Sequence, residues 1–339
     1  MPTSTVLYSA LAALTLTSGA AYANDANRAL VITASNGAAN TLLIHSADGT
    51  LLNSIPTQGQ GGVGGNAGGI ALGERYLAVV NFGSSTVSVF SVDREDRVLF
   101  LDELLNTVGG PVSVAFGHDH LYVLTTTHVE SHAITRRGVT ANPDGLTGLV
   151  KADGSAAQVG VLSHEVIISE KNNIIETVRL TADGALTGAA STVADLPANT
   201  NAPFGLATRG DSAYVTIAHA NEISLVRHDA VLTVTGSGTE MAPCWVALDG
   251  PYLYSANSPS RSVSRYLVHG QAITQEVAAA ARFNGSPTDI TYAGGLLAVI
   301  DGAGTQSHLS VFNVDDDGNL ALRGTGTMAG GVNGVAILR

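Results

Sequence analysis

A five-residue strand motif that opens with a small residue or proline recurs along this chain at nearly constant intervals. Clear copies begin at Gly68, Pro111, Pro203, Pro243, Pro287 and Val332. Neighbouring copies lie 43 (68 to 111), 40 (203 to 243), 44 (243 to 287) and 45 (287 to 332) residues apart. The 92-residue gap between 111 and 203 has room for two units and holds a degraded copy at 158–162. A period of about 40–50 residues with several strands per unit is typical of a β-propeller blade.

The two ends of the chain carry complementary parts of one unit. The repeat starts with a strand of the second type, Ala29–Thr33, and finishes with a strand of the first type at 332–338. Pairing of the C-terminal strand with the N-terminal blade would close the ring and remove its open sheet edges. The sequence therefore predicts an all-β fold, a seven-bladed β-propeller that forms one domain over residues 24–339.

The first residues precede the repeat and have another character. Leu7–Ala21 is a short apolar stretch, and Ala21-Tyr22-Ala23 follows it as a small-residue cleavage pattern. This combination predicts a signal peptide over residues 1–23 and a secreted or periplasmic protein. Removing it leaves 316 residues, about 45 for each of seven blades. No later segment is long and apolar enough for a membrane span, so none is expected.

Charge narrows the range of partners. The chain has 28 acidic and 16 basic residues, a net charge of -12, and lysine only at positions 151 and 171. A nucleic-acid-binding protein needs a basic patch, so no nucleic acid is expected, and a small-molecule substrate fits better. The single cysteine, Cys244, allows no intramolecular disulfide. Asn284-Gly285-Ser286 is the only glycosylation sequon, which makes Asn284 the candidate acceptor, although Pro287 directly after it disfavours its use.

The ends of the second strands form one ring of candidate positions around a propeller channel. Superposition of the units gives the ring Asn36, Asn81, Thr126, Glu170, Ala218 with His219 beside it, Asn257 and Asp301. Asn and Asp also start turns, which is the structural alternative for this pattern. Glutamate is not a turn former, and this makes Glu170, followed by Lys171, the stronger functional candidate.

A second ring comes from the loops that lead into the innermost strands. Asn66 lies there, and Trp245 is the only tryptophan of the chain and a candidate platform for a ligand, with Phe204 in the neighbouring unit. Arg261 follows Asn257 and is the best cation for a carboxylate or enolate oxygen. The alternatives are packing between blades for Trp245 and a solvated turn for Arg261. The glycine-rich run Gln58–Gly69 leads into a strand rather than a helix, so it predicts a close approach to the axis rather than a nucleotide site.

No redox cofactor or metal is expected, and the chain lacks the motifs of serine hydrolases and zinc proteases. One alternative is a Ca²⁺ site, because carboxylate and amide oxygens would surround an ion if four ring positions converge. Those positions are Asn81, Glu170, Asn257 and Asp301.

Three segments carry a family resemblance: Gln158–Leu180 with Ser169-Glu170-Lys171-Asn172 at its centre, Ala202-Pro203-Phe204-Gly205, and Ala242-Pro243-Cys244-Trp245-Val246. In these segments, and over the mature chain, the sequence resembles the secreted branch of the lactonase-like seven-bladed propellers, which includes 6-phosphogluconolactonases and carboxymuconate-lactonising enzymes. The resemblance implies a cofactor-independent enzyme for a lactone or an unsaturated organic acid. It also implies a histidine, a glutamate and arginines in the channel, roles that His219, Glu170 and Arg261 are able to fill. The paucity of cations points to a less charged substrate than those of the named enzymes.

The leading hypothesis is a lactone hydrolase or an intramolecular cyclase or isomerase. Glu170 is expected as the general acid and base, with His219 as an alternative proton carrier. Arg261, Asn81 and Asn257 are expected to stabilise oxyanion charge, and Asn66, Lys171, Phe204, Trp245 and Asp301 to bind substrate. Two alternatives stay open: a cyclase or pericyclase of the Diels-Alderase type, in which Trp245 and Phe204 preorganise an apolar substrate, and a non-catalytic binding propeller. An apolar pocket walled by these aromatic residues would favour the cyclase.

Overall fold

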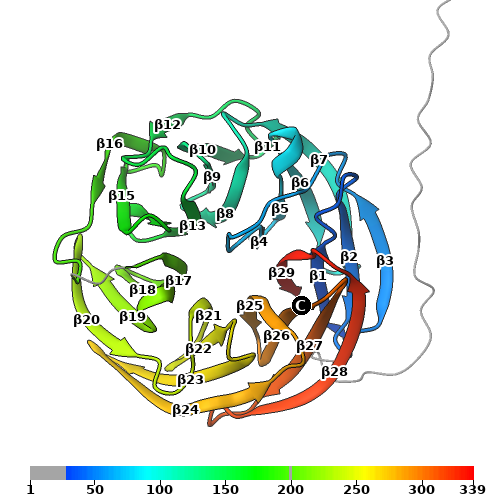
Figure 1. Ribbon diagram of the computed structural model, residues 1–339. Coiled ribbons are helices and arrows are strands. Elements are labelled where there is room, and N and C mark those ends of the chain that lie inside the picture. The colour runs from blue at the N-terminus through cyan, green and yellow to red at the C-terminus, as the bar shows by residue number, and fades with distance from the viewer. Residues whose placement is uncertain (1–27, 198–200) are drawn as a thin grey trace, which may run out of the picture.

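Alternation of apolar and polar residues, with Gly and Asp at the turns, builds seven antiparallel sheets arranged around one axis (Figure 1). The computed structural model describes residues 28–197 and 201–339. The predicted signal peptide, residues 1–23, lies outside the described residues. Within the described part, no helix has the length and apolar character needed to cross a membrane.

Each blade is numbered here by its order along the chain. The first blade combines β29 (Asn333–Leu338) with β1 (Leu30–Ala34), β2 (Thr41–Ser46) and β3 (Leu51–Pro56). The second contains β4 (Ile70–Leu72), β5 (Tyr76–Asn81), β6 (Thr86–Asp93) and β7 (Val98–Asn106). The third contains β8 (Pro111–Gly117), β9 (His120–Thr125), β10 (His128–Thr135), β11 (Gly138–Val139) and β12 (Gly145–Gly148).

The remaining blades follow the same order from the axis outward. The fourth contains β13 (Ala156–Val161), β14 (Glu165–Glu170), β15 (Ile174–Leu180) and β16 (Leu186–Thr192), and the fifth β17 (Pro203–Arg209), β18 (Ser212–Ile217), β19 (Glu222–Arg227) and β20 (Ala230–Gly236). The sixth contains β21 (Pro243–Asp249), β22 (Tyr252–Asn257), β23 (Ser262–His269) and β24 (Ala272–Arg282), and the seventh β25 (Ser286–Ala293), β26 (Leu296–Ala303), β27 (Gln306–Val314) and β28 (Leu320–Ala329). Short 3₁₀ turns, η1 (Phe82–Ser84) and η2 (Ala218–Ala220), follow β5 and β18.

The predicted closure of the ring is confirmed. The C-terminal strand β29 pairs antiparallel with β1, with Leu30 opposite Leu338 and Val31 opposite Ile337. In Figure 1 the red C-terminal strand accordingly lies beside the blue first strand, at the inner edge of the same blade. The first blade is thus completed by a segment about 300 residues away in sequence, and β1 is not left as an open edge.

The core lies between neighbouring blades rather than inside any one of them. The second strands β5, β9 and β18 are buried along their whole length, because residues on both of their faces pack against an adjacent sheet. One apolar cluster, for example, joins Val80 of the second blade to Tyr122 of the third and Ile168 of the fourth. Tyr122 and Tyr254 also donate hydrogen bonds to Gly184 and Gly318 in the following blade.

The Gly, Asp and Pro residues of segment 136–155 predict an exposed insertion between two blades, and the structure corrects this prediction. In the structure, β11 and β12 within this segment pair with β10 and form the split outer edge of the third blade. The Gly and Pro residues interrupt the outer strand rather than separating the blades, because an outer strand needs only one hydrogen-bonded neighbour.

A repeated bulge sets the direction of the side chains at the axis. In six of the seven inner strands, the pairing with the second strand shifts register near the first residues of the inner strand. A bulge inserts one extra residue and re-aims the side chains beside it. When the inner strands are aligned by their pairing with the second strands, the copies of the second and fourth blades start at Ala67 and Ala156. Counted in this alignment, the third residue of each copy lies beside the shift, and this position supplies the larger polar and aromatic side chains of the channel.

Candidate active site in the central channel

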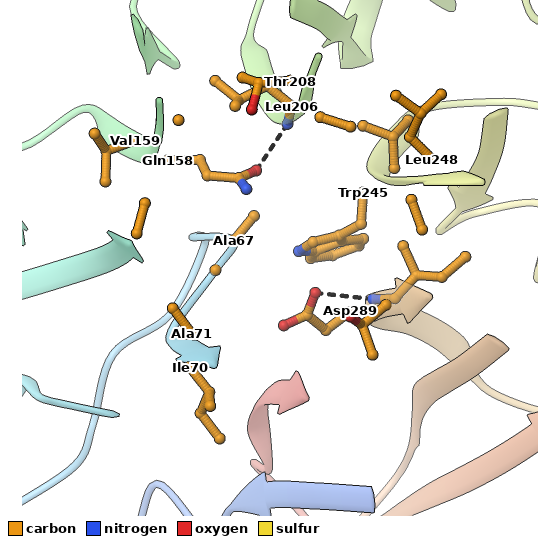
Figure 2. Close-up of a pocket in the computed structure, with 18 of the residues that line it drawn as sticks. Ala67, Ile70, Ala71, Gln158, Val159, Leu206, Thr208, Trp245, Leu248 and Asp289 are labelled. Carbon is orange, nitrogen blue, oxygen red and sulfur yellow. Dashed lines mark hydrogen bonds between the residues drawn. The ribbon is translucent and has the colours of Figure 1, made fainter. Parts of the chain in front are cut away.

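A cavity of about 400 Å³ fills the centre of the ring and is lined by residues of all seven inner strands (Figure 2). Its wall is an aliphatic ring from the fourth position of each motif copy: Ile70, Val114, Val159, Leu206, Val246, Ile290 and Val335. Small residues such as Ala71, Ala115 and Ala207 follow them and keep the channel open. The side chains of the wall are therefore mostly aliphatic, whereas polar atoms supply the larger part of the surface that faces the cavity.

Three larger side chains from the third motif position interrupt this wall. Gln158 comes from β13, Trp245 from β21 and Asp289 from β25. The other blades place Gly69, Ser113, Gly205 and Gly334 at the same position. Figure 2 shows the three large side chains converging on the channel from different blades. These three residues supply the polar and aromatic side chains of the cavity, and each is larger than the residues at the equivalent position in the other blades.

Asp289 is the one carboxylate among the described residues that line this cavity. Its side chain is 7% exposed and accepts a 2.8 Å hydrogen bond from the Ile290 N–H and another from the N–H of Val335. Burial outweighs these two bonds and raises the pKa of the Asp289 carboxyl to about 7. A carboxyl with a pKa near neutrality is able both to accept and to return a proton at physiological pH.

Gln158 supplies an amide to the same cavity from the fourth blade. Its Oε1 accepts a 2.7 Å hydrogen bond from the N–H of Leu206, which fixes the side chain against the next blade. Its Nε2 donates no hydrogen bond to any residue in the described part of the chain, and Gln158 lines the cavity. This leaves two N–H donors for a bound molecule.

Trp245 forms the aromatic part of the cavity wall. Its ring packs edge-on against Phe204, with ring centroids 5.2 Å apart and an interplanar angle of 82°. The indole Nε1 donates a 3.0 Å hydrogen bond to the main-chain oxygen of Asn66. The prediction that Trp245 lies at the axis is confirmed. Phe204 supports it from behind and is not among the residues that line the cavity.

The glycine-rich segment 58–69, called the plug here, lies across one mouth of the channel. Ala67 and Gly68 line the cavity. The N–H of Ala67 donates to the Ala157 oxygen at 3.1 Å, and the Asn66 side chain bonds the Val112 oxygen and the Asn333 amide. The plug therefore ties blades one, three, four and six together over the axis.

The plug needs glycine because main chains approach closely there. A Cβ on Gly61 would collide with the main chain of Asn36, and one on Gly69 with the side chain of Asn333. The predicted close approach to the axis is confirmed, and the segment runs into strand β4 rather than into a helix. Lys171 stabilises the plug by donating a 2.6 Å hydrogen bond from Nζ to the Gly65 oxygen.

Exposure along the inner strands shows where the channel opens. Trp245 and Asp289, near the plug, are buried, whereas Phe116, Thr208 and Tyr292 near the opposite ends of their strands are half-buried. The open mouth, called the turn face here, lies where the first and second strands of each blade are joined. The sequence hypothesis placed the site at the other mouth, which the plug covers.

Glu170 lies at the end of β14, on the side of the plug, and is fully buried. Its Oε2 accepts a 2.6 Å hydrogen bond from Ser155, and its Oε1 has no partner among the described residues. Burial, with help from the nearby carboxylate of Glu176, raises the pKa of Glu170 to about 7 against the opposing effect of the Ser155 bond. Glu170 does not line the channel cavity.

The other two predicted catalytic residues lie apart from Glu170. His219 is an exposed residue of η2, with Nδ1 3.3 Å from the Asn201 oxygen Oδ1. Arg261 is exposed and donates a 3.0 Å hydrogen bond to the main-chain oxygen of Asn284. No hydrogen bond or ion pair joins Glu170, His219 and Arg261 in residues 28–197 and 201–339. The structure thus does not bring these three residues together in one site. Asn284, the candidate glycosylation acceptor, is exposed.

Asn81 and Asn257 are fully buried and hold their own blades together. The Asn81 amide donates to Thr86 and Ser88, and the Asn257 amide donates to Ser262 and Ser264.

Asp301 is paired with His308 at 3.3 Å within the seventh blade. The four oxygen-bearing residues of the Ca²⁺ alternative, Asn81, Glu170, Asn257 and Asp301, therefore belong to four separate blades. In the described part of the chain, no group of three or more His, Cys, Asp or Glu side chains is arranged to hold a metal ion.

Asp289 and Gln158 are the site residues that sequence reasoning missed. Both stand at the third position of motif copies that define the repeat, at the place where other copies carry Gly or Ser. The signal was therefore the departure from a small residue at one position of the inner strand. Of the three residues with this signal, the sequence analysis selected only Trp245, and it did so because Trp245 is the only tryptophan of the chain.

The comparisons with solved structures agree with this architecture. A proposed 6-phosphogluconolactonase from Bacteroides fragilis superposes with a TM-score of 0.64 at 13% identity, covering 94% of this chain and 100% of that chain. A periplasmic gluconolactonase from Pseudomonas aeruginosa gives 0.64 at 16% identity, covering 92% and 98%. A virginiamycin B lyase from Staphylococcus aureus gives 0.55 at 13% identity, covering 82% and 93%.

The sequence comparisons are negative, since neither a family model nor a curated protein matches the chain. The likeness is one of fold, carried by the closed ring of seven antiparallel blades. The chain has the fold of the 6-phosphogluconolactonase-like seven-bladed propellers.

Proposed function

We propose that this protein is a lactonase-like enzyme that opens a small, weakly charged cyclic ester in the central channel. The observation that carries the proposal is the buried Asp289 carboxyl, which lines the same cavity as the free amide of Gln158. A cavity of about 400 Å³ suits a small ring compound. The names of two fold relatives, a gluconolactonase and a proposed 6-phosphogluconolactonase, support this class of substrate.

The groups present are sufficient for a balanced hydrolysis. Asp289, as the carboxylate, takes a proton from a water molecule while the water oxygen bonds to the lactone carbonyl carbon. The Gln158 Nε2 donates a hydrogen bond to the oxyanion that forms. The ring C–O bond then breaks, and the departing alkoxide oxygen receives the proton from Asp289. The product is an open hydroxy acid, and the channel groups return to their initial state.

Turnover of a panel of five- and six-membered lactones, followed by acid release, tests this assignment. Asp289→Asn keeps the size of the side chain and removes the base, so kcat/KM should fall about 100-fold or more. Asp316→Asn is the matched control, because Asp316 is exposed on a turn of the seventh blade. Full turnover by Asp289→Asn, or no turnover of any lactone by the wild type, would contradict the proposal.

The aliphatic side chains of the wall favour a second candidate, an intramolecular cyclase that holds a reactive apolar substrate against Trp245. Preorganisation alone accelerates such reactions, so no proton-transfer group is needed. In that case Trp245→Ala would abolish turnover while Asp289→Asn would retain it. The same two variants therefore separate the two functions.

The remaining sequence-based assignments are kept as proposals with their own tests. Glu170, with a pKa raised to about 7 and an unpartnered oxygen, is the alternative acid-base group. We further propose export through the predicted signal peptide, which N-terminal sequencing of the mature protein would check.

A further inference from the structure

The open mouth of the channel continues into a second cavity on the turn face. This side cavity has a volume of about 430 Å³ and lies between the seventh, first and second blades. It shares five lining residues with the channel: Ile70, Ala71, Thr291, Tyr292 and Val335. A molecule leaving the channel on this side passes directly into it.

Two arginines line the side cavity. Arg94 comes from the turn after β6, and Arg339 follows β29 at the end of the chain. None of the described residues lining this cavity carries a side-chain carboxylate. In a chain with a net charge of -12, two guanidinium groups that line one cavity are a local concentration of positive charge.

Arg94 is held in place by the main chain. Its Nε donates a 2.8 Å hydrogen bond to the Glu74 oxygen, and its Nη2 a 2.7 Å bond to the Gly73 oxygen. A guanidinium has five N–H donors, so the two bonds leave three for a ligand. Because the side chain is already ordered, less rotamer entropy is lost when it binds an anion.

Arg339 approaches from the other side of the side cavity. Its guanidinium packs so closely over Gly294 that a Cβ there would collide with it. Tyr292, which lines both cavities, lies close to Arg339, and its phenol also interacts with the carboxylate of Asp249. The cations of the first and second blades thus face the same space beside the channel mouth.

We infer that this side cavity is an anion site, and that Arg94 and Arg339 hold the carboxylate of a small hydroxy acid there. The inference rests on the proposed function for the origin of this ligand, because opening a neutral lactone in the channel creates a carboxylate. A planar carboxylate matches the geometry of a guanidinium donor pair. The uncharged lactone lacks this attraction, so the site distinguishes product from substrate.

Titration calorimetry with sodium gluconate, a hydroxy acid, tests the site without any need for turnover. The double variant Arg94→Gln/Arg339→Gln should bind gluconate about tenfold or more weakly than the wild type. The matched control is Arg136→Gln/Arg137→Gln, which removes the same charge from exposed positions on the turn between β10 and β11. It should bind like the wild type. D-Glucitol, a neutral polyol of the same length, should not distinguish these proteins.

Undetectable gluconate binding to the wild type, or equal weakening in the control double variant, would overturn the anion site. The proposed lactonase activity fails by a different readout, namely full lactone turnover by Asp289→Asn or none by the wild type. Gluconate binding that depends on the two arginines supports the site even if the lactone panel is negative. Lactone turnover with arginine-independent gluconate binding rejects the site alone.

Discussion

The indole N–H of Trp245 donates a 3.0 Å hydrogen bond to the main-chain oxygen of Asn66, joining the sixth blade to the plug over the channel. The two residues are 179 positions apart in the chain. This bond connects a wall residue of the cavity to the plug. The Asn66 side chain in turn bonds the main-chain oxygen of Val112 and the side chain of Asn333. Trp245 thus holds the plug in place and also lines the cavity.

Trp245→Phe should destabilise the protein by about 1–3 kcal/mol, because the Asn66 oxygen would lose its buried donor. Urea unfolding followed by circular dichroism measures the change. Phe204→Leu is the control, since it removes the edge-on ring contact and retains the indole bond. Equal or greater destabilisation by the control would show that ring packing, rather than the hydrogen bond, fastens the plug.

Deletion of residues 332–339 should destabilise the whole domain rather than one blade. The deletion removes β29 and leaves β1 as an inner edge strand with unpaired main-chain groups facing the channel. Thermal unfolding and size-exclusion chromatography should reveal a lower melting temperature and aggregation. A truncated protein that melts like the full chain would contradict the closure of the ring.

The fold could be predicted because its signal is repeated. The motif spacing of 40–45 residues and the strand types at the two ends specify seven blades and their closure without any knowledge of side-chain contacts. Site prediction failed where it relied on polar residues at strand ends. Asn81 and Asn257 are followed at the fifth and seventh positions by hydroxyl residues that accept their amide hydrogens, so their role is internal.

The direction of Asp289 could not be derived from strand alternation alone. The register shift between Pro287 and Asp289 re-aims the side chains that follow, and no residue in the sequence marks this bulge unambiguously. The plug posed a similar difficulty. Its approach to the axis was foreseeable from its glycines, but its choice of mouth depends on contacts with Ala157 and Asn333 that lie far away in the chain.

Asp289 should make folding stability depend on pH. Burial raises its folded-state pKa to about 7, above the unfolded value of about 3.9, so the folded protein binds the proton more tightly. The stability gained from this proton is present below about pH 4 and is lost as the pH rises through 7. Asp289→Asn does not titrate and should lose less stability between pH 4 and 8, by up to about 4 kcal/mol.

Urea unfolding of the wild type, Asp289→Asn and Asp316→Asn at several pH values between 4 and 8 measures this difference. The Asp316→Asn control should follow the wild type, because its carboxyl is exposed. Parallel stability curves for wild type and Asp289→Asn would mean that the carboxylate is well solvated in the channel. That result would also remove the basis for a base poised near neutrality.

Glu170→Gln should preserve lactone turnover and alter only stability. Glu170 does not line the channel, and its burial among the blades penalises the carboxylate form. The amide should therefore stabilise the protein at pH 8 relative to the wild type. Comparison of kcat and of unfolding at pH 8 separates the two properties. Loss of turnover without loss of stability would instead support Glu170 as the acid-base group.

Lys171→Met should loosen the plug. The ammonium donates to the Gly65 oxygen and lies 3.4 Å from the Ala156 oxygen, so its loss removes bonds between the plug and the fourth blade. Hydrogen exchange at the Ala67 amide, which bonds the Ala157 oxygen, should become faster, and stability should fall by about 1 kcal/mol. Lys151→Met is the control, because Lys151 binds a carbonyl oxygen at Asn172, away from the plug. Equal hydrogen exchange at the Ala67 amide in the two variants would mean that Asn66 and Trp245 hold the plug without help from Lys171.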